Sequence, residues 1–187
     1  MRYSHAVCAT LAINPLIAAL ASTGAAAQSI QVTIPGTTMP WEYNSKLNRK
    51  RMFGTNDGTG PVVITLTSLN AAPGQTLQIK YLSGQICPGG GYPCVDARGY
   101  SGFVTDHNLG NSGTYFPSLY VKKEPTYLEE LIGVYTDSKG KLIGRPFAVP
   151  DRHAQAIPAG ATQLQLGAND DIFSDNTGSW LIKVTVK

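Results

Sequence analysis

Histidine is scarce in this 187-residue sequence, and the motifs of common hydrolases are absent. Outside the first 27 residues only His107 and His153 remain. Neither Gly-x-Ser-x-Gly nor His-Glu-x-x-His occurs, so there is no signature of a serine-hydrolase nucleophile or of a zinc protease. A nucleophile, its base and an orienting group would have to come from scattered residues, and we therefore expect a binding protein rather than an enzyme.

Excess charge of one sign is also missing. Without Arg2, which belongs to the leader described below, 14 basic and 12 acidic residues remain, a net charge of +2. This balance argues against a nucleic-acid interface, which needs a clustered basic face. We interpret the densest basic run, residues 46–51 (KLNRKR), as a solvated loop, although a few of its charges could touch an anionic surface.

The first 27 residues have the pattern of a secretory signal peptide. Arg2 precedes an apolar stretch over residues 6–21, and three alanines at 25–27 supply a cleavage site. The stretch is shorter than the roughly 20 apolar residues that a membrane-spanning helix needs. We therefore expect cleavage after Ala27, one mature domain over residues 28–187, and a secreted or periplasmic bacterial protein without a membrane span.

Two cysteines remain after removal of the leader, Cys87 and Cys94 in CPGGGYPC. In an oxidising compartment, two thiols across a Gly/Pro-rich turn should form one disulfide. Because the closed loop is short, the bond should stabilise the protein by only about 2–3 kcal/mol. Its expected role is to fix a surface loop. A zinc site is less compatible, because no histidine accompanies the two cysteines.

Short alternating apolar runs separated by turn residues dominate residues 28–187. A period of two residues turns one face of a strand inward. Turn signals such as Pro73-Gly74 and Thr177-Gly178 lie between the runs. The runs lie at residues 30–34, 62–67, 77–81, 131–135, 142–143, 164–166 and 180–186. Many short strands without a long 3.6-residue period predict an all-β fold, a β-sandwich, with no second domain.

The segment 84–119 does not follow this alternation. It is rich in Gly, Pro, Asn and Tyr, and loops of this length inside a compact domain are usually functional or partly disordered. Its tyrosines, Tyr92, Tyr100, Tyr115 and Tyr120, offer flat amphipathic rings that can stack on sugars. The segment is a candidate binding rim, and local packing of the tyrosines is the alternative.

The densest group of oxygen-bearing side chains lies between the last two apolar runs. It consists of Asn169, Asp170, Asp171, Asp175 and Asn176. Calcium takes six to eight oxygen ligands, and one tight loop can supply several of them. Asp and Asn also fill ordinary turns, because their side chains bond their own backbone. From these residues alone, a calcium site and a plain turn both remain open.

Three segments, Pro73–Lys80, Leu131–Phe147 and above all Pro158–Val186, resemble the calcium-dependent galactophilic lectins of PA-IL type. That bacterial family has a galactose-binding-domain-like jelly roll, in which one calcium ion bridges the last inter-strand loop to two sugar hydroxyls. Asn169-Asp170 matches the opening of this loop, and residues 175–180 (DNTGSW) match its close.

The resemblance implies a calcium site and a sugar site that share residues. The implied metal ligands are the side chains of Asp170, Asp175 and Asn176, the carbonyl of Ile172 or Phe173, and a carbonyl near Cys87-Pro88. The implied sugar contacts are Asp170, Asp171, Asn176 and His107. The loop between Asp170 and Asp175 is shorter than in the galactose binders, and Asp175 replaces an asparagine. Calcium is therefore better supported than galactose.

The resemblance predicts a secreted, calcium-dependent lectin for galactosides or other neutral glycans, with a homo-oligomer as one option. A structural or matrix β-sandwich, in which calcium only stabilises the loop, is the alternative from a different class. A glycan hydrolase would need paired carboxylates, for which the candidates are Glu129, Glu130, Asp170 and Asp171. We interpret Glu129-Glu130 as a solvated patch and the loop aspartates as metal ligands, so the hydrolase is the least favoured function.

Overall fold

The computed structural model describes residues 28–43 and 46–187, and the leader predicted at residues 1–27 lies outside them. Its strands are β1 (Ser29–Pro35), β2 (Val62–Thr65), β3 (Thr76–Cys87), β4 (Tyr100–Val104), β5 (Tyr127–Leu128), β6 (Leu131–Thr136), β7 (Leu142–Ala148), β8 (Arg152–Ala156), β9 (Gln163–Ala168) and β10 (Thr177–Val186). Two short 3-10 turns accompany them, η1 (Leu66–Leu69) and η2 (Pro117–Tyr120). Within the described ranges, no helix has the length and apolar character needed to cross a membrane.

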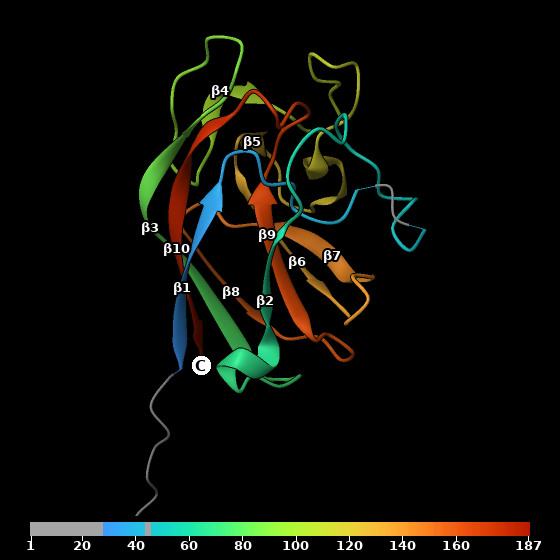
Figure 1. The fold of residues 1–187 in the computed structure, drawn as a ribbon, viewed down its shortest axis with the longest axis vertical. Coiled ribbons are helices and arrows are strands. Elements are labelled where there is room, and N and C mark those ends of the chain that lie inside the picture. The colour runs from blue at the N-terminus through green and yellow to red at the C-terminus, as the bar shows by residue number, and fades with distance from the viewer. Residues whose placement is uncertain (1–27, 44–45) are drawn as a thin grey trace, which may run out of the picture.

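Two four-stranded antiparallel sheets form the body of the protein (Figure 1). One sheet has the strand order β1-β10-β3-β8, and the other has the order β2-β9-β6-β7. Strands β4 and β5 form a separate two-stranded ribbon. The two larger sheets share one apolar core, to which residues of both contribute. The predicted all-β sandwich is therefore confirmed.

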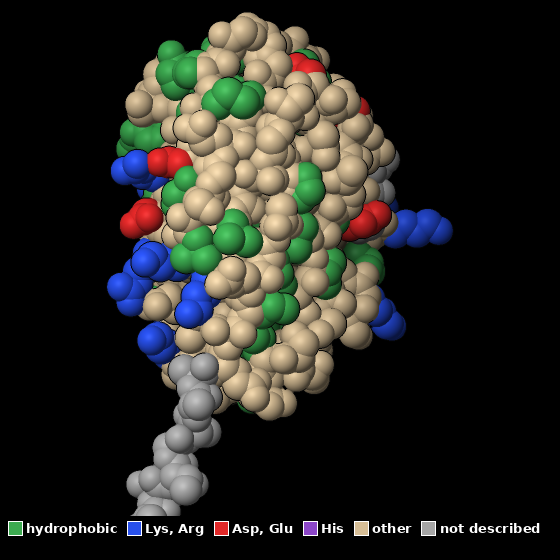
Figure 2. All heavy atoms as spheres, turned by 60° about the vertical axis from the view of Figure 1, so that its left-hand side comes forward, with side chains coloured by type: hydrophobic (Ala, Val, Ile, Leu, Met, Phe, Trp, Pro, Cys, Tyr) green, Lys and Arg blue, Asp and Glu red, His purple; other side chains and the backbone are tan. Residues whose placement is uncertain are grey.

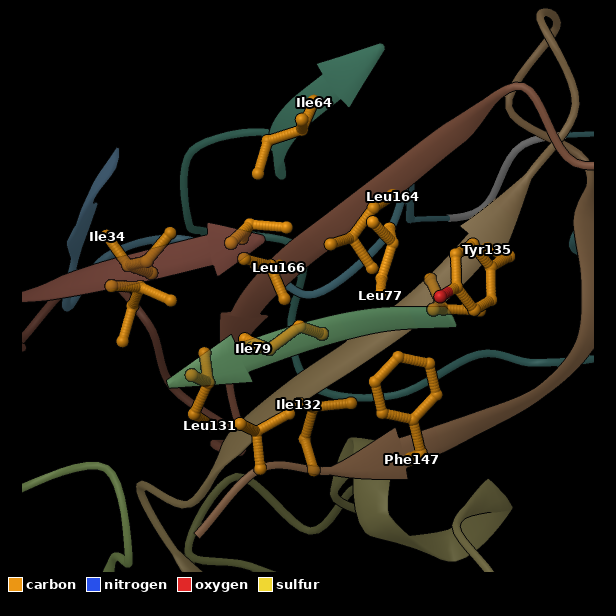
Figure 3. Packing of buried hydrophobic residues seen from close by; sticks show 14 of the residues in the cluster. Ile34, Ile64, Leu77, Ile79, Leu131, Ile132, Tyr135, Phe147, Leu164 and Leu166 are labelled. Atoms are coloured by element: carbon orange, nitrogen blue, oxygen red, sulfur yellow. The ribbon is translucent and has the colours of Figure 1, made fainter. Parts of the chain in front are cut away.

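Alternation explains which face is buried in strands such as β10, whereas every residue of β6 is buried. In β10, Trp180, Ile182 and Val184 are fully buried, whereas Leu181 and Lys183 between them are only partly buried. Figure 3 shows Leu77 and Ile79 of β3 in the same cluster as Leu166 of β9, so the core joins the two sheets. Burying one such aliphatic side chain stabilises the fold by about 1.5–3 kcal/mol.

The sequence-based expectation omits strands β4, β5 and β8 and ends β3 too early. Alternation does not predict β8, because its five residues include no large apolar side chain. The strand forms through main-chain pairing with β3, in which Ile79 lies opposite His153. Strand β3 also runs beyond the predicted end at residue 81. Gly84 continues the pairing opposite Trp180, and its φ of 96° is one that favours glycine.

The predicted disulfide joins Cys87 to Cys94. It closes the loop that leaves the end of β3, just beyond a bridge between Ile86 and Val95. The Nε1–H of Trp180 donates to the Val95 carbonyl oxygen at 3.1 Å, which ties the far side of the loop to β10. Residues 88–93 are thereby fixed at the end of the sandwich where the β9–β10 loop also lies.

Candidate functional site

The β9–β10 loop, residues 169–176, turns several polar side chains into the protein rather than toward solvent. The buried members are Asn169, Asp170, Asp171 and Asn176, each at most 4% exposed. Aspartate and asparagine are mostly exposed in folded proteins, and buried polar atoms normally have hydrogen-bond partners. An ordinary surface turn does not account for this burial, so the partners of each side chain have to be traced.

Asn169 has a structural role. Its Oδ1 accepts a hydrogen bond from the Ser118 N–H at 2.9 Å. Its Nδ2 donates to Thr105 Oγ1 at 2.9 Å and to the Tyr127 carbonyl oxygen at 2.8 Å. Because its amide is fully used in joining these segments, it is not a candidate ligand.

Asp171 holds the neighbouring loop. Its Oδ2 accepts the Ser112 N–H at 2.7 Å, and its carboxylate packs so closely against Gly110 that a Cβ there would collide with it. Its main-chain carbonyl accepts the Thr55 N–H at 3.1 Å. Asp171 therefore positions residues 110–114 beside the β9–β10 loop.

Asp170 and Asn176 face one another at the two ends of the same loop. Asp170 Oδ1 accepts the Asp171 N–H at 2.7 Å, and its Oδ2 accepts a hydrogen bond from Asn176 Nδ2 at 2.8 Å. Asn176 Nδ2 also donates to the Gly36 carbonyl oxygen at 3.2 Å. Both neighbours of Nδ2 are acceptors, which fixes the orientation of the amide. Asn176 Oδ1 is consequently buried without a hydrogen-bond partner.

Glu129 completes this buried cluster, although the sequence indicates a solvated patch. That interpretation is wrong, because both Glu129 and Glu130 are fully buried. Glu130 is paired with Lys123, whose Nζ lies 2.9 Å from its Oε1. Neither carboxylate oxygen of Glu129 meets the geometry of a hydrogen bond, although the Asp170 and Asn176 side chains lie beside this carboxyl. Its backbone also has a φ of 59°, which is uncommon for a residue other than glycine.

Like charges and burial act together on the two carboxyl groups. Burial raises the pKa of Glu129 well above its ordinary value, and the neighbouring Asp170 carboxylate raises it further. Burial also raises the pKa of Asp170 to about 6, although the Glu129 and Asn176 side chains and the Asp171 N–H favour its charged form. Among the described residues, the charged groups that act on either carboxyl are all acidic. The charged forms of both carboxyl groups are therefore disfavoured in this cluster.

A narrow pocket of about 40 Å³ opens beside the cluster. It is lined by Pro88, Gly89, Gly90, Tyr92, Phe103, Asn111, Phe116, Leu128, Asp170, Asp171, Ile172 and Asp175. The Tyr92 ring packs against Tyr100 and Phe103 at centroid distances of 5.9 and 5.8 Å, which forms an aromatic wall. The pocket has room for an ion or a few waters. A sugar ring could only lie across its mouth.

The other residues implied as metal ligands lie around this pocket in different roles. Asp175 and Pro88 line it, and a Cβ at Gly89 would collide with the Asp175 carboxylate. Burial and the charges of neighbouring acids raise the pKa of Asp175. The Phe173 carbonyl oxygen accepts the Asn176 N–H at 3.3 Å, and its ring is buried against Phe53. The structure thus brings Asp170, Asp175, Asn176 and Pro88 together.

The structure does not bring His107 to the pocket. Its exposed imidazole lies 3.2 Å from the exposed Glu124 carboxylate, and it is not among the residues that line the pocket. The sequence predicts no metal-binding role for Glu129, which is only one of the candidate paired carboxylates of a hydrolase. The only signal for it is the pair of acidic residues between Leu128 and Leu131, which interrupts an apolar run without a turn residue.

No protein-family model, curated protein or solved structure matches this chain. In residues 28–43 and 46–187, no three His, Cys, Asp or Glu side chains are grouped so that they could hold a metal ion between them. The oxygen cluster described above is of a different composition, since it combines two carboxyl groups with an amide oxygen. Calcium accepts such mixed oxygen ligands together with main-chain carbonyls and waters.

Proposed function

We propose that this domain binds carbohydrate through a calcium ion held by Asp170, Asn176 and Glu129. The observation that carries the proposal is the set of three buried oxygens without hydrogen-bond partners, Oε1 and Oε2 of Glu129 and Oδ1 of Asn176. Leaving a buried acceptor unsatisfied costs about 1–3 kcal/mol, and more for a charged group. A divalent cation would satisfy all three and neutralise the neighbouring Asp170.

The residues present fit calcium better than a transition metal. Every candidate ligand is an oxygen, which calcium prefers, whereas histidine and cysteine suit zinc and copper. Asp175, which lines the pocket beside Asp170, would add a carboxylate from the rim. When bound, calcium would supply coordination positions for hydroxyl groups or waters. The chain itself would fix the ion's depth and the direction from which a ligand approaches.

The walls of the pocket suit a neutral polyol lying across its mouth. Tyr92 would offer an aromatic face, and Asn111 would offer an amide. Such a shallow contact buries little area, so we expect a dissociation constant on the order of 10 μM to 1 mM for a monosaccharide. We also propose that the sandwich is a galactose-binding-domain-like jelly roll, as the resemblance implies.

The small volume of the pocket supports a second function. If calcium fills the space of about 40 Å³ and the rim stays closed, the ion would only join the β9–β10 loop to the start of β6. The protein would then be a calcium-stabilised structural or matrix domain without a sugar ligand. The two functions share the metal site and differ in glycan binding.

A glycan array probed with the mature protein, in calcium and in chelator, tests the proposal. We expect binding to galactosides or other neutral glycans in calcium, loss of binding in chelator, and loss on Asn176→Ala. Glycan binding that survives chelation would exclude the calcium-bridged mode. Calcium binding by calorimetry without any glycan binding would identify the structural domain instead.

A further inference from the structure

Six cationic side chains surround two adjoining hollows that the carbohydrate proposal does not use. One hollow of about 250 Å³ is lined by Lys46, Leu47, Asn48, Arg49, Lys50, Arg51, Lys141 and Leu142. The second, of about 300 Å³, is lined by Lys50, Arg51, Leu119, Tyr120 and Arg145. The hollows adjoin because they share Lys50 and Arg51. We call the six cations, Lys46, Arg49, Lys50, Arg51, Lys141 and Arg145, the basic surface.

The loop that carries four of these cations is fixed to the β6–β7 hairpin. Asn48 is buried, its Nδ2 donates to the Gly140 carbonyl oxygen at 2.8 Å, and its Oδ1 accepts the Leu142 N–H at 3.2 Å. The Trp41 Nε1–H donates to the Arg51 carbonyl oxygen at 3.1 Å. Figure 1 shows the segment after β1 and the β6–β7 hairpin on the same side of the sandwich. The charges are solvated, as the sequence indicates, but the backbone beneath them is held in place.

The cations of the basic surface have no ion-pair partners among the described residues. The ion pairs found there are Arg98–Asp96, His107–Glu124 and Lys123–Glu130. Asp137, in the β6–β7 hairpin, accepts the main-chain N–H groups of Lys139 and Lys141. A cluster of cations without ion pairs in a nearly neutral domain creates a local positive potential that attracts anions.

Exposed apolar side chains border the basic surface. Met52 directly follows Arg51 and is 41% exposed, and it lines a third hollow together with Leu109 and Tyr115, which are 54% and 43% exposed. Leu47 lies within the basic loop and is 49% exposed. A soluble anion gains little from exposed leucine or methionine. A lipid bilayer buries apolar side chains just below its charged headgroups, so the combination favours a membrane surface.

We propose that this face docks on a membrane rich in anionic lipids. The cations would contact headgroup phosphates, while Leu47, Met52 and Leu109 would enter the boundary with the acyl chains. Each Lys or Arg close to an anionic surface strengthens binding roughly fivefold. The proposal needs neither calcium nor sugar, because none of these side chains belongs to the cluster of Glu129 and Asp170.

The other sheet supplies a charge-matched control surface. Lys183, Lys80 and Arg152 lie opposite one another on the adjacent strands β10, β3 and β8. Figure 2 shows Lys and Arg side chains gathered on the lower part of the side that carries this sheet. Among the described residues, none of the large, exposed apolar side chains comes from these three strands. This row therefore has positive charge without the apolar border.

The test is co-sedimentation of the mature protein with vesicles, in chelator. Vesicles of phosphatidylglycerol mixed with phosphatidylcholine are compared with vesicles of phosphatidylcholine alone. We expect binding to the anionic vesicles only, weakened by added salt. The triple variant Lys46→Gln, Arg49→Gln and Lys50→Gln should bind on the order of 100-fold more weakly. The control triple Lys80→Gln, Arg152→Gln and Lys183→Gln removes the same charge and should lose less than about threefold, because its cations lie away from the docking face.

A double variant, Leu47→Ser with Leu109→Ser, separates a membrane from a soluble polyanion. It should weaken vesicle binding severalfold and leave retention on a sulfated polysaccharide unchanged. The proposal is overturned by absence of binding to anionic vesicles, by equal losses in the two triple variants, or by vesicle binding that the leucine substitutions do not change. Melting temperatures within a few degrees of wild type in chelator establish that each variant is folded.

Discussion

Glu129 and Asp170 bring two carboxyl groups together in the interior, one just before β6 and the other just after β9. The strands explain the meeting. Leu131 at the start of β6 pairs with Ala168 at the end of β9, and the Glu129 N–H donates to the Asn169 carbonyl oxygen at 2.9 Å. Two carboxylates cannot both stay charged in such a place without compensation. The cluster must therefore hold either a proton or a cation, and the two possibilities predict different responses to substitution.

The first prediction concerns Glu129→Gln. Because burial and Asp170 raise the pKa of Glu129, this carboxyl costs stability as the pH rises above its unfolded pKa. A glutamine keeps the shape, removes the charge and offers an N–H to its acidic neighbours. In chelator at pH 7 we expect the variant to be more stable by about 1–3 kcal/mol. In calcium it should lose the stabilisation that the wild type shows, which thermal unfolding in both buffers measures.

Glu130→Gln is the matched control, since Glu130 is equally buried but has a cation. Lys123 Nζ lies 2.9 and 3.2 Å from its two carboxylate oxygens. Losing a charged hydrogen bond costs about 1.5–3 kcal/mol, so this variant should be less stable than wild type in both buffers. It should keep the full response to calcium. If calcium stabilises the Glu129 and Glu130 variants equally against thermal unfolding, Glu129 is not a calcium ligand.

The second prediction is that calcium raises the melting temperature through Asp170. A ligand at 100 times its dissociation constant stabilises the native state by about 2.7 kcal/mol, which corresponds to roughly 5–10 °C for a domain of this size. Asp170→Ala should abolish the rise, because it removes a carboxylate that also orients Asn176. Asp151→Ala, a change of an exposed acid, should leave it unchanged. If calorimetry finds no calcium-dependent rise in the melting temperature of the wild type, the β9–β10 loop is an ordinary turn and not a calcium site.

The sandwich and the disulfide could be predicted from local patterns. Alternation in residues 180–186 indicates a half-buried strand, and the structure buries Trp180 and Ile182. The pairing of Cys87 with Cys94 follows from a short spacing across a turn. Strand β8 could not be predicted in this way, because what forms it is an available edge of β3 rather than its own apolar residues.

The candidate site could be predicted only where its residues are close in sequence. Asp170 and Asn176 belong to one loop, and their side chains meet. Glu129 lies just before β6, far away in sequence, and its place beside Asp170 depends on the register of β6 with β9, which no local pattern reveals. The resemblance implies His107 as a sugar contact, but its side chain pairs with Glu124 instead.

The third prediction tests Asp175 through its neighbour Gly89. A Cβ at residue 89 would collide with the Asp175 carboxylate, so Gly89→Ala should displace that side chain from the pocket. If Asp175 is a ligand from the rim, calcium affinity should fall by about tenfold, equivalent to 1.4 kcal/mol. Gly60→Ala is the control, since an added Cβ there meets no atom within 4 Å. Unchanged calcium affinity in Gly89→Ala, measured by calorimetry, would exclude Asp175.

The last prediction links the disulfide to the candidate site. Pro88, Gly89, Gly90 and Tyr92 line the pocket, and all four lie within the loop that the Cys87–Cys94 bond closes. Replacing both cysteines by serine should lower the free energy of unfolding by about 2–3 kcal/mol, because a short cross-link constrains the unfolded chain only modestly. The larger effect should be on ligand binding, since the loop would have to be ordered each time a glycan binds.

We expect Asp170, Asn176 and Glu129, which lie outside the loop, to retain calcium in the double variant. Titration of calcium and of a bound glycan against the wild type and this variant separates the two contributions. If glycan affinity is unchanged while stability falls, the loop only braces the fold, and the aromatic wall around Tyr92 is not part of the binding surface.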